Sequence, residues 1–198
     1  MKTEKPTTKI IAGKYKGKIL ELPSLDVTRS SKARLKESLF NVLQFDIIDK
    51  IFIESFAGSG SIGLEAISRG AKRAYFVELD RNSYQILLKN CKAVDMEKCQ
   101  TVQGNTFVQT PLFIDFLKNS QDEIVLYVDP PFDYRDGMED IYEKSFSMIQ
   151  NIEVDNIYMV IVEHVSSLEV PEILGKFSLN KTKKFGKSAL SYYSYTQE

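Results

Sequence analysis

The strongest constraint on the fold is the rhythm of the chain from about residue 50 onward, where short apolar runs alternate with amphipathic segments of helical length. The apolar runs that predict strands are "KIFIESF", "RAYFVEL", "QTVQGN", "EIVLYVD" and "NIYMVIVEHV". The segments that predict helices between them are "SIGLEAISRG", "RNSYQILLKNCKAV", "PLFIDFLKNS" and "MEDIYEKSFSMIQ". Such alternation is typical of βαβ units around a parallel sheet, so we predict an open, doubly wound α/β fold.

The N-terminal part of the chain departs from this rhythm. Apolar stretches at 10–12 and 19–22 flank a turn rich in Gly and Lys, which predicts a β-hairpin. "SSKARLKESLFNVLQF" follows with apolar residues at helical spacing, and Ser30 or Ser31 is placed to cap that helix. We therefore expect two parts: an extension made of this hairpin and helix, residues 1–45, and a main domain, residues 46–198.

The C-terminal stretch departs from the rhythm in another way. "KFSLNKTKKFGKSALSYYSYT" predicts a hairpin that turns near Gly186, with "SYYSY" alternating as an edge strand does. These strands would extend the parallel sheet with antiparallel neighbours. The sheet is therefore expected to be mostly, and not wholly, parallel.

The charge of the chain is nearly balanced but unevenly distributed. Lys and Arg number 26 against 27 Asp and Glu, a formal net charge of −1. Residues 1–36 nevertheless carry ten Lys or Arg, and residues 176–187 carry five Lys and no acidic residue. This asymmetry indicates a basic face for a polyanion on an otherwise acidic body, although for any single lysine a place on a solvated face is the simpler explanation.

Cysteine, histidine and the N-terminal residues bear on metal binding and on the cellular compartment. Cys91 and Cys99 are accompanied by one histidine, His164, so no zinc pattern can be assembled and we predict no metal. Two free thiols suit a reducing cytosol. "MKTEKPTT" lacks the apolar run of a signal peptide, and no segment has the length of a membrane span, so we expect a cytoplasmic protein without membrane contact.

A glycine turn follows the first strand of the main domain. In "ESFAGSGSIGLEA", Gly58, Gly60 and Gly63 fit G-x-G-x-x-G between a strand and a helix. Glu78 ends the second strand, twenty residues after Gly58, where an acid accepts hydrogen bonds from ribose hydroxyls. Together they predict a nucleoside-containing cofactor, either NAD or S-adenosylmethionine, while a glycine turn that only packs a helix on a sheet is the structural alternative.

The stretch "VLYVDPPFDY" favours one of these cofactors. Its strand is the fourth from Ile51, and in a doubly wound sheet the fourth strand lies beside the first, where the strand order reverses. Asp129 and the two prolines that follow it then face the glycine turn. A Pro-Pro corner offers carbonyl and carboxylate acceptors but almost no donors, which suits an exocyclic amine, and Phe132 supplies a flat face for a planar ring.

Asp-Pro-Pro-Phe resembles the (Asn/Asp)-Pro-Pro-(Phe/Tyr) signature of methyltransferases that act on the amines of bases. The chain as a whole resembles the bacterial small-subunit (16S) rRNA guanine-N2 methyltransferases, which have the class I, Rossmann-like S-adenosylmethionine-dependent fold. The similarity covers about Ile10 to Tyr195. Its blocks, in family order, are "IIAGKYKGKIL", "TRSSKARLKESLFNVL", "FAGSGSIGLEAISRGA", "VELDR", "VDPPF", "VIVEH" and "KFGKSALSYYSY".

The resemblance implies methyl transfer from S-adenosyl-L-methionine to the N2 amine of a guanine in 16S rRNA, with S-adenosyl-L-homocysteine as product. It implies catalysis by Asp129, Pro130, Pro131 and Phe132. The implied cofactor-binding residues are Glu54, Phe56, Ala57, Gly58, Ser59, Gly60, Glu78, Leu79, Asn105 and Thr106. Glu54 would lie near the methionine amino group, Glu78 on the ribose, and Asn105 with Thr106 beside the adenine, although Glu54 as a strand-end acid that caps the glycine turn is the alternative.

The 16S rRNA would be recognised within the small ribosomal subunit or an assembly intermediate of it. The protein would act as a monomer that flips the guanine out of its stack. Phosphates would be held by the basic hairpin, by the segment from Arg29 to Lys36 and by the C-terminal lysines. The predicted RNA-binding residues are Lys14, Lys16, Lys18, Arg29, Lys32, Arg34, Lys181, Lys183 and Lys184. Tyr134 and Arg135 would line the mouth of the site. His164 is interpreted as a strand-end packing residue and not as a general base.

Three alternatives remain open from the residues alone. An NAD-linked oxidoreductase would use the same glycine turn but gives no reason for the Asp-Pro-Pro-Phe corner. A catalytically silent RNA-binding module would not need both Glu78 and Asp129. An adenine-N6 methyltransferase on DNA or RNA keeps the chemistry, and only the wider resemblance argues against it.

Overall fold

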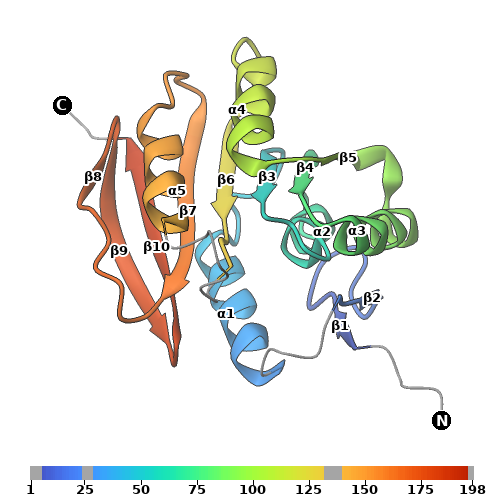
Figure 1. Cartoon of the computed structure of the whole chain (residues 1–198). Helices are drawn as coiled ribbons and strands as arrows, with labels where there is room; N and C mark the ends of the chain where they lie inside the picture. The colour runs from blue at the N-terminus through green and yellow to red at the C-terminus, as the bar shows by residue number, and fades with distance from the viewer. Residues whose placement is uncertain (1–5, 24–28, 132–139, 196–198) are drawn as a thin grey trace.

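The computed structural model describes residues 6–23, 29–131 and 140–195, and for residues 29–32 it describes the backbone alone (Figure 1). The strands are β1 (Thr7–Lys9), β2 (Ile19–Glu21), β3 (Ile51–Ser55), β4 (Arg73–Glu78), β5 (Cys99–Gln103), β6 (Ile124–Val128), β7 (Ile157–Val165), β8 (Ile173–Leu174), β9 (Phe177–Phe185) and β10 (Ser188–Tyr195). The helices are α1 (Arg29–Val42), α2 (Ser61–Ser68), α3 (Arg81–Val94), α4 (Thr106–Leu117) and α5 (Ile141–Gln150), with a 3₁₀ turn, η1 (Met96–Lys98).

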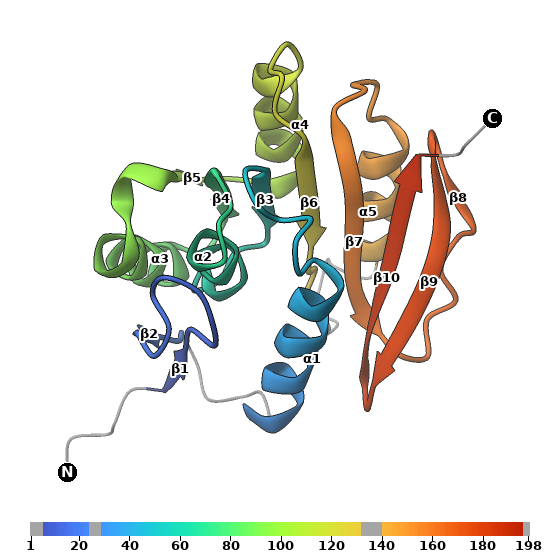
Figure 2. The same cartoon turned by 180° about the vertical axis from the view of Figure 1, so that it is seen from behind.

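The main sheet has the order β5-β4-β3-β6-β7-β10-β9-β8. Strand β3 pairs in parallel with both β4 and β6, so the strand order reverses beside β3. Helices α1, α2 and α3 contribute to the apolar core on one face of the sheet, and α4 and α5 to the core on the other (Figures 1 and 2). The prediction of a doubly wound, mostly parallel α/β fold is confirmed.

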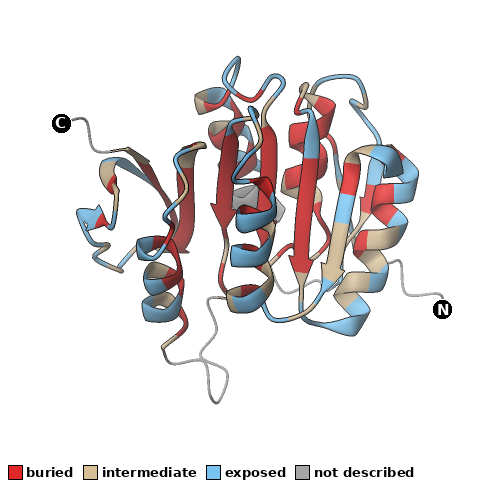
Figure 3. Cartoon of the chain, turned by 90° about the horizontal axis from the view of Figure 1, so that it is seen from above, coloured by how far each residue is buried: buried red, intermediate tan, exposed pale blue. Residues whose placement is uncertain are grey.

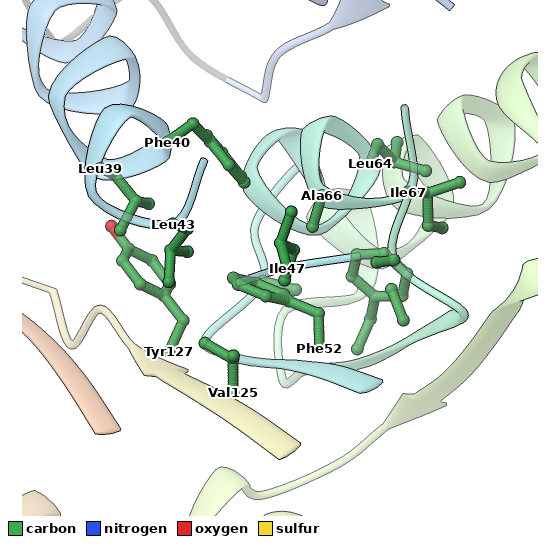
Figure 4. Close-up of a cluster of buried hydrophobic side chains, with 14 of the residues drawn as sticks. Leu39, Phe40, Leu43, Ile47, Phe52, Leu64, Ala66, Ile67, Val125 and Tyr127 are labelled. Atoms are coloured by element: carbon green, nitrogen blue, oxygen red, sulfur yellow. The ribbon is translucent and has the colours of Figure 1, made fainter. Parts of the chain in front are cut away.

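The centre of the sheet is a rigid platform because both of its faces are covered. Every residue of β3 and β6 is buried, as the view coloured by burial shows (Figure 3). On the face of α1 and α2, Phe52 stacks on Tyr127 with ring centroids 6.1 Å apart, among leucines and isoleucines of the two helices (Figure 4). Burial of each large apolar side chain stabilises the fold by about 1.5–3 kcal/mol. This packing holds the carboxyl ends of β3 and β6 in place.

The C-terminal hairpin lies as predicted beside β7, with one correction. The turn contains Gly186 at φ 62°, a left-handed conformation that glycine adopts without strain. Strand β10 is antiparallel to both β7 and β9, so "SYYSY" is an interior strand and the expectation of an edge strand is wrong. The outer side is occupied by β9 and by β8, a two-residue strand that the sequence did not predict.

The N-terminal hairpin is present, and its second strand, β2, lies in the predicted stretch 19–22, but its first strand is β1 and not residues 10–12 as expected. Ile10 still donates to the Lys18 carbonyl and accepts the N–H of Gly17, but the backbone donors of the next two residues find a distant carboxylate instead. The N–H groups of Ile11 and Ala12 donate to Glu65 of α2, at 2.7 Å and 3.0 Å. The division of the chain at residue 45 stays a prediction.

Two helix starts also differ from the prediction. Helix α1 runs from Arg29, so the backbone of Ser30 and Ser31 lies within the helix and not before it, as a capping residue would. Helix α4 begins at Thr106, five residues before Pro111, where the sequence suggested a start. The side chain of Asn105 caps α4 by accepting the N–H of Phe107, and the proline is accommodated inside the helix.

Candidate active site

The glycine turn and the Asp129 corner leave the sheet side by side. In the parallel pairing of β3 with β6, Ser55 is opposite Val128, and the N–H of Asp129 donates to the Ser55 carbonyl at 3.4 Å. The glycine turn starts at Phe56, directly after β3, and the corner starts at Asp129, directly after β6. The expectation that the two segments share the carboxyl edge of the sheet, across the reversal of strand order, is confirmed.

The glycine turn is tightly wound. Phe56, Gly58 and Gly60 have φ values of 63°, 54° and 74°, all in the left-handed region. A Cβ on Gly60 would lie 2.4 Å from Leu87 Cδ1, which would have to shift, and the positive φ alone would strain any other residue there. Phe56 adopts the same region at a cost of the order of 1 kcal/mol, the kind of backbone strain that concentrates at functional sites.

Glu54 lies beneath this turn and is fully buried. Its Oε2 accepts the N–H of Gly63 at 2.8 Å, in the first turn of α2. Burial raises the pKa of its carboxyl to about 8, and the negative charge of Asp129 adds to that effect, whereas the N–H groups of Gly63 and Ile62 and the ammonium of Lys36 oppose it. The contact is the capping role weighed for Glu54, and its role toward a cofactor amino group stays a prediction.

Glu78 closes the other side of the turn. Its Oε2 accepts the N–H of Gly58 at 2.6 Å, and its Oε1 accepts the N–H of Asp80 at 2.7 Å. Burial raises the pKa of this carboxyl, against the hydrogen bonds from the two backbone N–H groups. The spacing of twenty residues thus corresponds to direct contact across the turn. Leu79, the next residue, is exposed and borders the same space.

The end of β5 supplies a third wall. Thr106 is buried, whereas Asn105 is exposed and engages its side-chain oxygen in the cap of α4. Phe107, which the sequence reasoning missed, meets Phe56 edge to face with ring centroids 5.7 Å apart. Phe107 directly follows the predicted pair Asn105-Thr106 near the end of a strand, and this position could have identified it as a site residue.

A cavity of about 1600 Å³ joins these walls to the corner. Of the predicted site residues, it is lined by Phe56, Glu78, Leu79, Asn105, Thr106, Asp129 and Pro131. Glu54 lies behind the lining, as do Ala57 to Gly60 and the buried Pro130. The cavity also reaches Pro23 and Gln103, which no sequence signal indicated, and continues along α5. Phe132, Tyr134 and Arg135 fall outside the described residues.

Below the corner lies a second buried polar pair. The Tyr127 hydroxyl donates to the Glu163 carboxylate at 2.5 Å. Burial, and then the charge of Glu163, raises the pKa of this tyrosine well above its usual value. His164 is also buried: its Nε2 lies 2.8 Å from Ser191 Oγ and its Nδ1 2.9 Å from the Val165 carbonyl, and burial lowers its pKa. These contacts agree with the packing role predicted for His164.

The predicted RNA-binding residues divide into three groups. Those with described side chains are exposed: Lys14, Lys16, Lys18, Arg34, Lys181, Lys183 and Lys184. The side chains of Arg29 and Lys32 fall outside the described residues. Lys36 belongs to the segment assigned to phosphates, but it is buried, donates to the Lys9 carbonyl at 2.8 Å and pairs with Glu65 at 3.5 Å, so that assignment is wrong for Lys36.

The described residues contain neither a metal-binding cluster nor a membrane-spanning helix. No group of three or more His, Cys, Asp or Glu side chains there is arranged to hold a metal ion. In the same residues no helix has the length and apolar character needed to cross a membrane.

Three features define a Rossmann-like methyltransferase of the S-adenosylmethionine-dependent class. They are the parallel sheet whose strand order reverses beside β3, the glycine turn with Glu78, and the neighbouring corner at Asp129. A family model described as "Conserved hypothetical protein 95" matches residues 8–194. Ribosomal RNA small subunit methyltransferase D of Escherichia coli strain K12 is 30% identical over 187 residues, which cover 93% of this chain and 88% of that protein. Its namesake in Haemophilus influenzae is 38% identical over 133 residues, 66% of each chain. The chain therefore belongs to this family of ribosomal RNA methyltransferases.

Solved structures agree with the fold. A putative methyltransferase, yhhF, from Escherichia coli superposes with a TM-score of 0.70 at 30% identity, covering 98% of this chain and 100% of that one. An RNA methyltransferase from Salinibacter ruber, solved in complex with S-adenosyl-L-homocysteine, has a TM-score of 0.57 at 14% identity over 88% of this chain and 95% of that one. At that identity the likeness supports the fold alone.

Proposed function

We propose that the protein transfers a methyl group from S-adenosylmethionine to the exocyclic N2 of a guanine in small-subunit (16S) rRNA. The observation that carries the proposal is the pairing of β3 with β6, which sets an acceptor-only corner directly beside the glycine turn. The protein would act as a monomer in the cytoplasm, on the small ribosomal subunit or on an assembly intermediate of it.

The cofactor site fits the donor by its size and its groups. A cavity of about 1600 Å³ holds a nucleoside with room for a second planar ring. Glu78 would exchange its bond from the Gly58 N–H for the ribose hydroxyls, and the adenine would lie against the side chains of Phe56, Leu79 and Phe107. Glu54 would hold the methionine ammonium, with the backbone of Ala57 to Gly60 around the amino-acid end.

S-adenosylmethionine supplies an electrophilic methyl group on a positively charged sulfur. The guanine N2 lone pair would form the new C–N bond as the carbon–sulfur bond breaks, which leaves S-adenosylhomocysteine, and one N2 proton would then pass to water. Asp129 and the Pro130 carbonyl accept the two N–H groups of the amine, which holds the nitrogen in line with the methyl carbon. The same acceptors stabilise the positive charge that develops on nitrogen, and Phe132 would stack on the base.

The RNA would be held by a basic face made of elements distant in sequence. Helix α1, with exposed Arg34, contacts β9, with exposed Lys181, Lys183 and Lys184. Lys14, Lys16 and Lys18 lie on the loop between β1 and β2. Phosphate contacts of this kind position the RNA without reading its sequence and weaken steeply with salt.

Transfer of a radiolabelled methyl group tests the proposal. With labelled S-adenosylmethionine we expect label in 16S rRNA of small-subunit particles prepared from cells that lack the gene, and none in particles that are already modified. A thermal-shift comparison gives the control for the cofactor: S-adenosylhomocysteine should stabilise the protein and NAD should not. Stabilisation by NAD alone, or RNA binding without transfer, would reject the proposal in favour of an oxidoreductase or a silent RNA-binding module.

A further inference from the structure

One buried side chain joins the glycine turn to the N-terminal hairpin. Asn90 of α3 is 2% exposed. Its Nδ2 donates to the Ser59 carbonyl at 2.8 Å and to the Glu21 carbonyl at 2.9 Å, while its Oδ1 accepts the Glu21 N–H at 2.9 Å. A carboxamide that uses both donors and its acceptor in three directed bonds is fixed in one orientation, so Ser59 and β2 are held at a set distance.

The strand that Asn90 holds leads to the cofactor cavity. Two residues after Glu21, Pro23 lines this cavity together with Glu78 and Leu79. The same side chain therefore fixes the backbone of the turn and the strand that enters the cavity wall. A shift of β2 would change the cavity, and a shift of the turn would move β2.

The other end of the hairpin is held on α2, which follows the turn directly. Besides the two bonds to Glu65, the N–H of Tyr15 donates to Ser68 Oγ at 2.9 Å and the N–H of Lys14 donates to the Ser68 carbonyl at 2.7 Å. The approach is so close that a Cβ on Gly13 would lie 1.8 Å from the Ser68 carbonyl oxygen. The loop between β1 and β2, which carries Lys14, Lys16 and Lys18 and is called the lysine loop below, is thus attached to α2, while β2 is attached to the glycine turn through Asn90.

We propose that Asn90 is a positioning residue that couples occupancy of the cofactor site to the order of β2 and, through β2, to RNA binding by the lysine loop. Contact of the cofactor with the turn restrains the Ser59 carbonyl, the carbonyl restrains the Asn90 amide, and the amide restrains both backbone groups of Glu21. Such coupling is reciprocal, so RNA held by the loop tightens cofactor binding by the same factor. The link from turn to β2 requires only the cofactor, whereas its consequence for RNA rests on the proposed function.

Hydrogen exchange of the Glu21 amide tests the link without RNA. Saturating S-adenosylhomocysteine should slow this exchange about tenfold in the wild-type protein, within the usual range of coupling between sites. In Asn90→Asp the carboxylate keeps an acceptor but can donate to neither carbonyl, so the slowing should vanish although calorimetry shows the site filled. Gln85→Glu is the matched control, because Gln85 is exposed on the same helix and undergoes the same change of charge. Asn90→Ala replaces the aspartate variant if that does not fold.

Equal slowing in the wild type and a folded Asn90 variant, or no slowing in the wild type, would overturn the inference. A second measurement addresses RNA: S-adenosylhomocysteine should tighten binding of a 16S rRNA transcript in the wild type and in Gln85→Glu but not in Asn90→Asp. If β2 responds and the transcript is not bound, the function proposal fails while the link stands. If rRNA is methylated and β2 does not respond, the link fails and the function stands.

Discussion

The carboxyl of Glu54 sits under the glycine turn with a pKa of about 8, so near neutral pH it is mostly protonated in the free protein. To hold a cofactor ammonium it must give up that proton. We therefore expect the Kd of S-adenosylhomocysteine to fall about tenfold from pH 6 to pH 7 and to level off above pH 8. Calorimetry across this range measures it, and in Glu54→Gln the dependence should disappear. An unchanged slope in that variant would contradict the assignment.

The same shift has a consequence for stability. Because the pKa of Glu54 is raised in the folded state, the folded chain holds this proton more tightly than the unfolded chain. The stability that it contributes is fully present below about pH 4.5, the ordinary pKa of the group, and is lost as the pH rises from there to about 8. Bound cofactor, which pairs the carboxylate with a cation, should remove that loss.

Asp129 is the residue on which the chemistry depends. We expect Asp129→Ala to slow methyl transfer by about 10²-fold in single-turnover experiments, the effect of removing one group aimed at developing charge. Asp129→Asn should lose less activity, because it keeps one acceptor oxygen. Binding of S-adenosylhomocysteine should stay within about threefold of wild type, as it should for Asp122→Ala, a carboxylate that precedes β6 at the other edge of the sheet. Transfer by Asp129→Ala at the wild-type rate would refute the role.

At the scale of residues, the sequence predicted which residues lie close together better than it predicted their individual contacts. The spacing of Gly58 and Glu78 indicated proximity, and the two residues do touch. The sequence did not predict that Asn105 caps α4 or that Phe107 packs on Phe56. Both contacts depend on where α4 starts, and the identity of a single residue does not determine that.

At the scale of elements, α2 holds the N-terminal hairpin through one buried acid. Glu65 accepts two backbone N–H groups, pairs with Arg69 at 2.8 Å and lies 3.5 Å from the buried ammonium of Lys36. Burial lowers the pKa of that lysine, against the attraction of Glu65. The N-terminal hairpin, α1 and α2 are thus linked through a single carboxylate.

We expect Glu65→Ala to lower the free energy of unfolding by about 3–5 kcal/mol, because it leaves a buried ammonium without its partner. Chemical denaturation measures this. The double variant Glu65→Leu with Lys36→Met should recover most of the loss, since neither charge then remains buried. A loss below about 1 kcal/mol, the range of exposed ion pairs, would show that the carboxylate does not anchor these elements.

The elements themselves were largely predictable, since the periodicity of apolar residues identified every strand of the parallel part of the sheet. The errors have a common cause. Residues 10–12 resemble a strand until their distant partner is known, and Pro111 resembles the start of α4 until the cap by Asn105 is known. The backbone donors of Ile11 and Ala12 bond to a carboxylate more than fifty residues away, which no local pattern reveals.

At the scale of the whole molecule, the distribution of charge matters more than its total of −1. Strand β9, which carries three of the C-terminal lysines, contacts α1, so elements from the two basic segments of the sequence adjoin. The distribution of charge in the sequence indicated a polyanion, but only the topology brings α1 and β9 together.

We expect the triple substitution of Lys181, Lys183 and Lys184 by Glu to weaken binding of a 16S rRNA transcript by at least about 10²-fold at low salt, and to reduce the slope of log K against log salt. Binding of S-adenosylhomocysteine should not change. The control is Lys118→Glu, an exposed lysine that follows α4 on the other face of the sheet. If only the control variant loses RNA binding, the RNA lies on the face of α4, and the proposed basic face is contradicted.

The identity of the modified nucleoside tests the central claim, that the corner at Asp129 presents the N2 amine of an extruded guanine to a methyl group held beside the glycine turn. The measurement is mass spectrometry of the nucleosides released from small-subunit rRNA after reaction with isotopically labelled S-adenosylmethionine. We predict that the label resides in N2-methylguanosine, at one position. Label in N6-methyladenosine, or no labelled base at all, would contradict it.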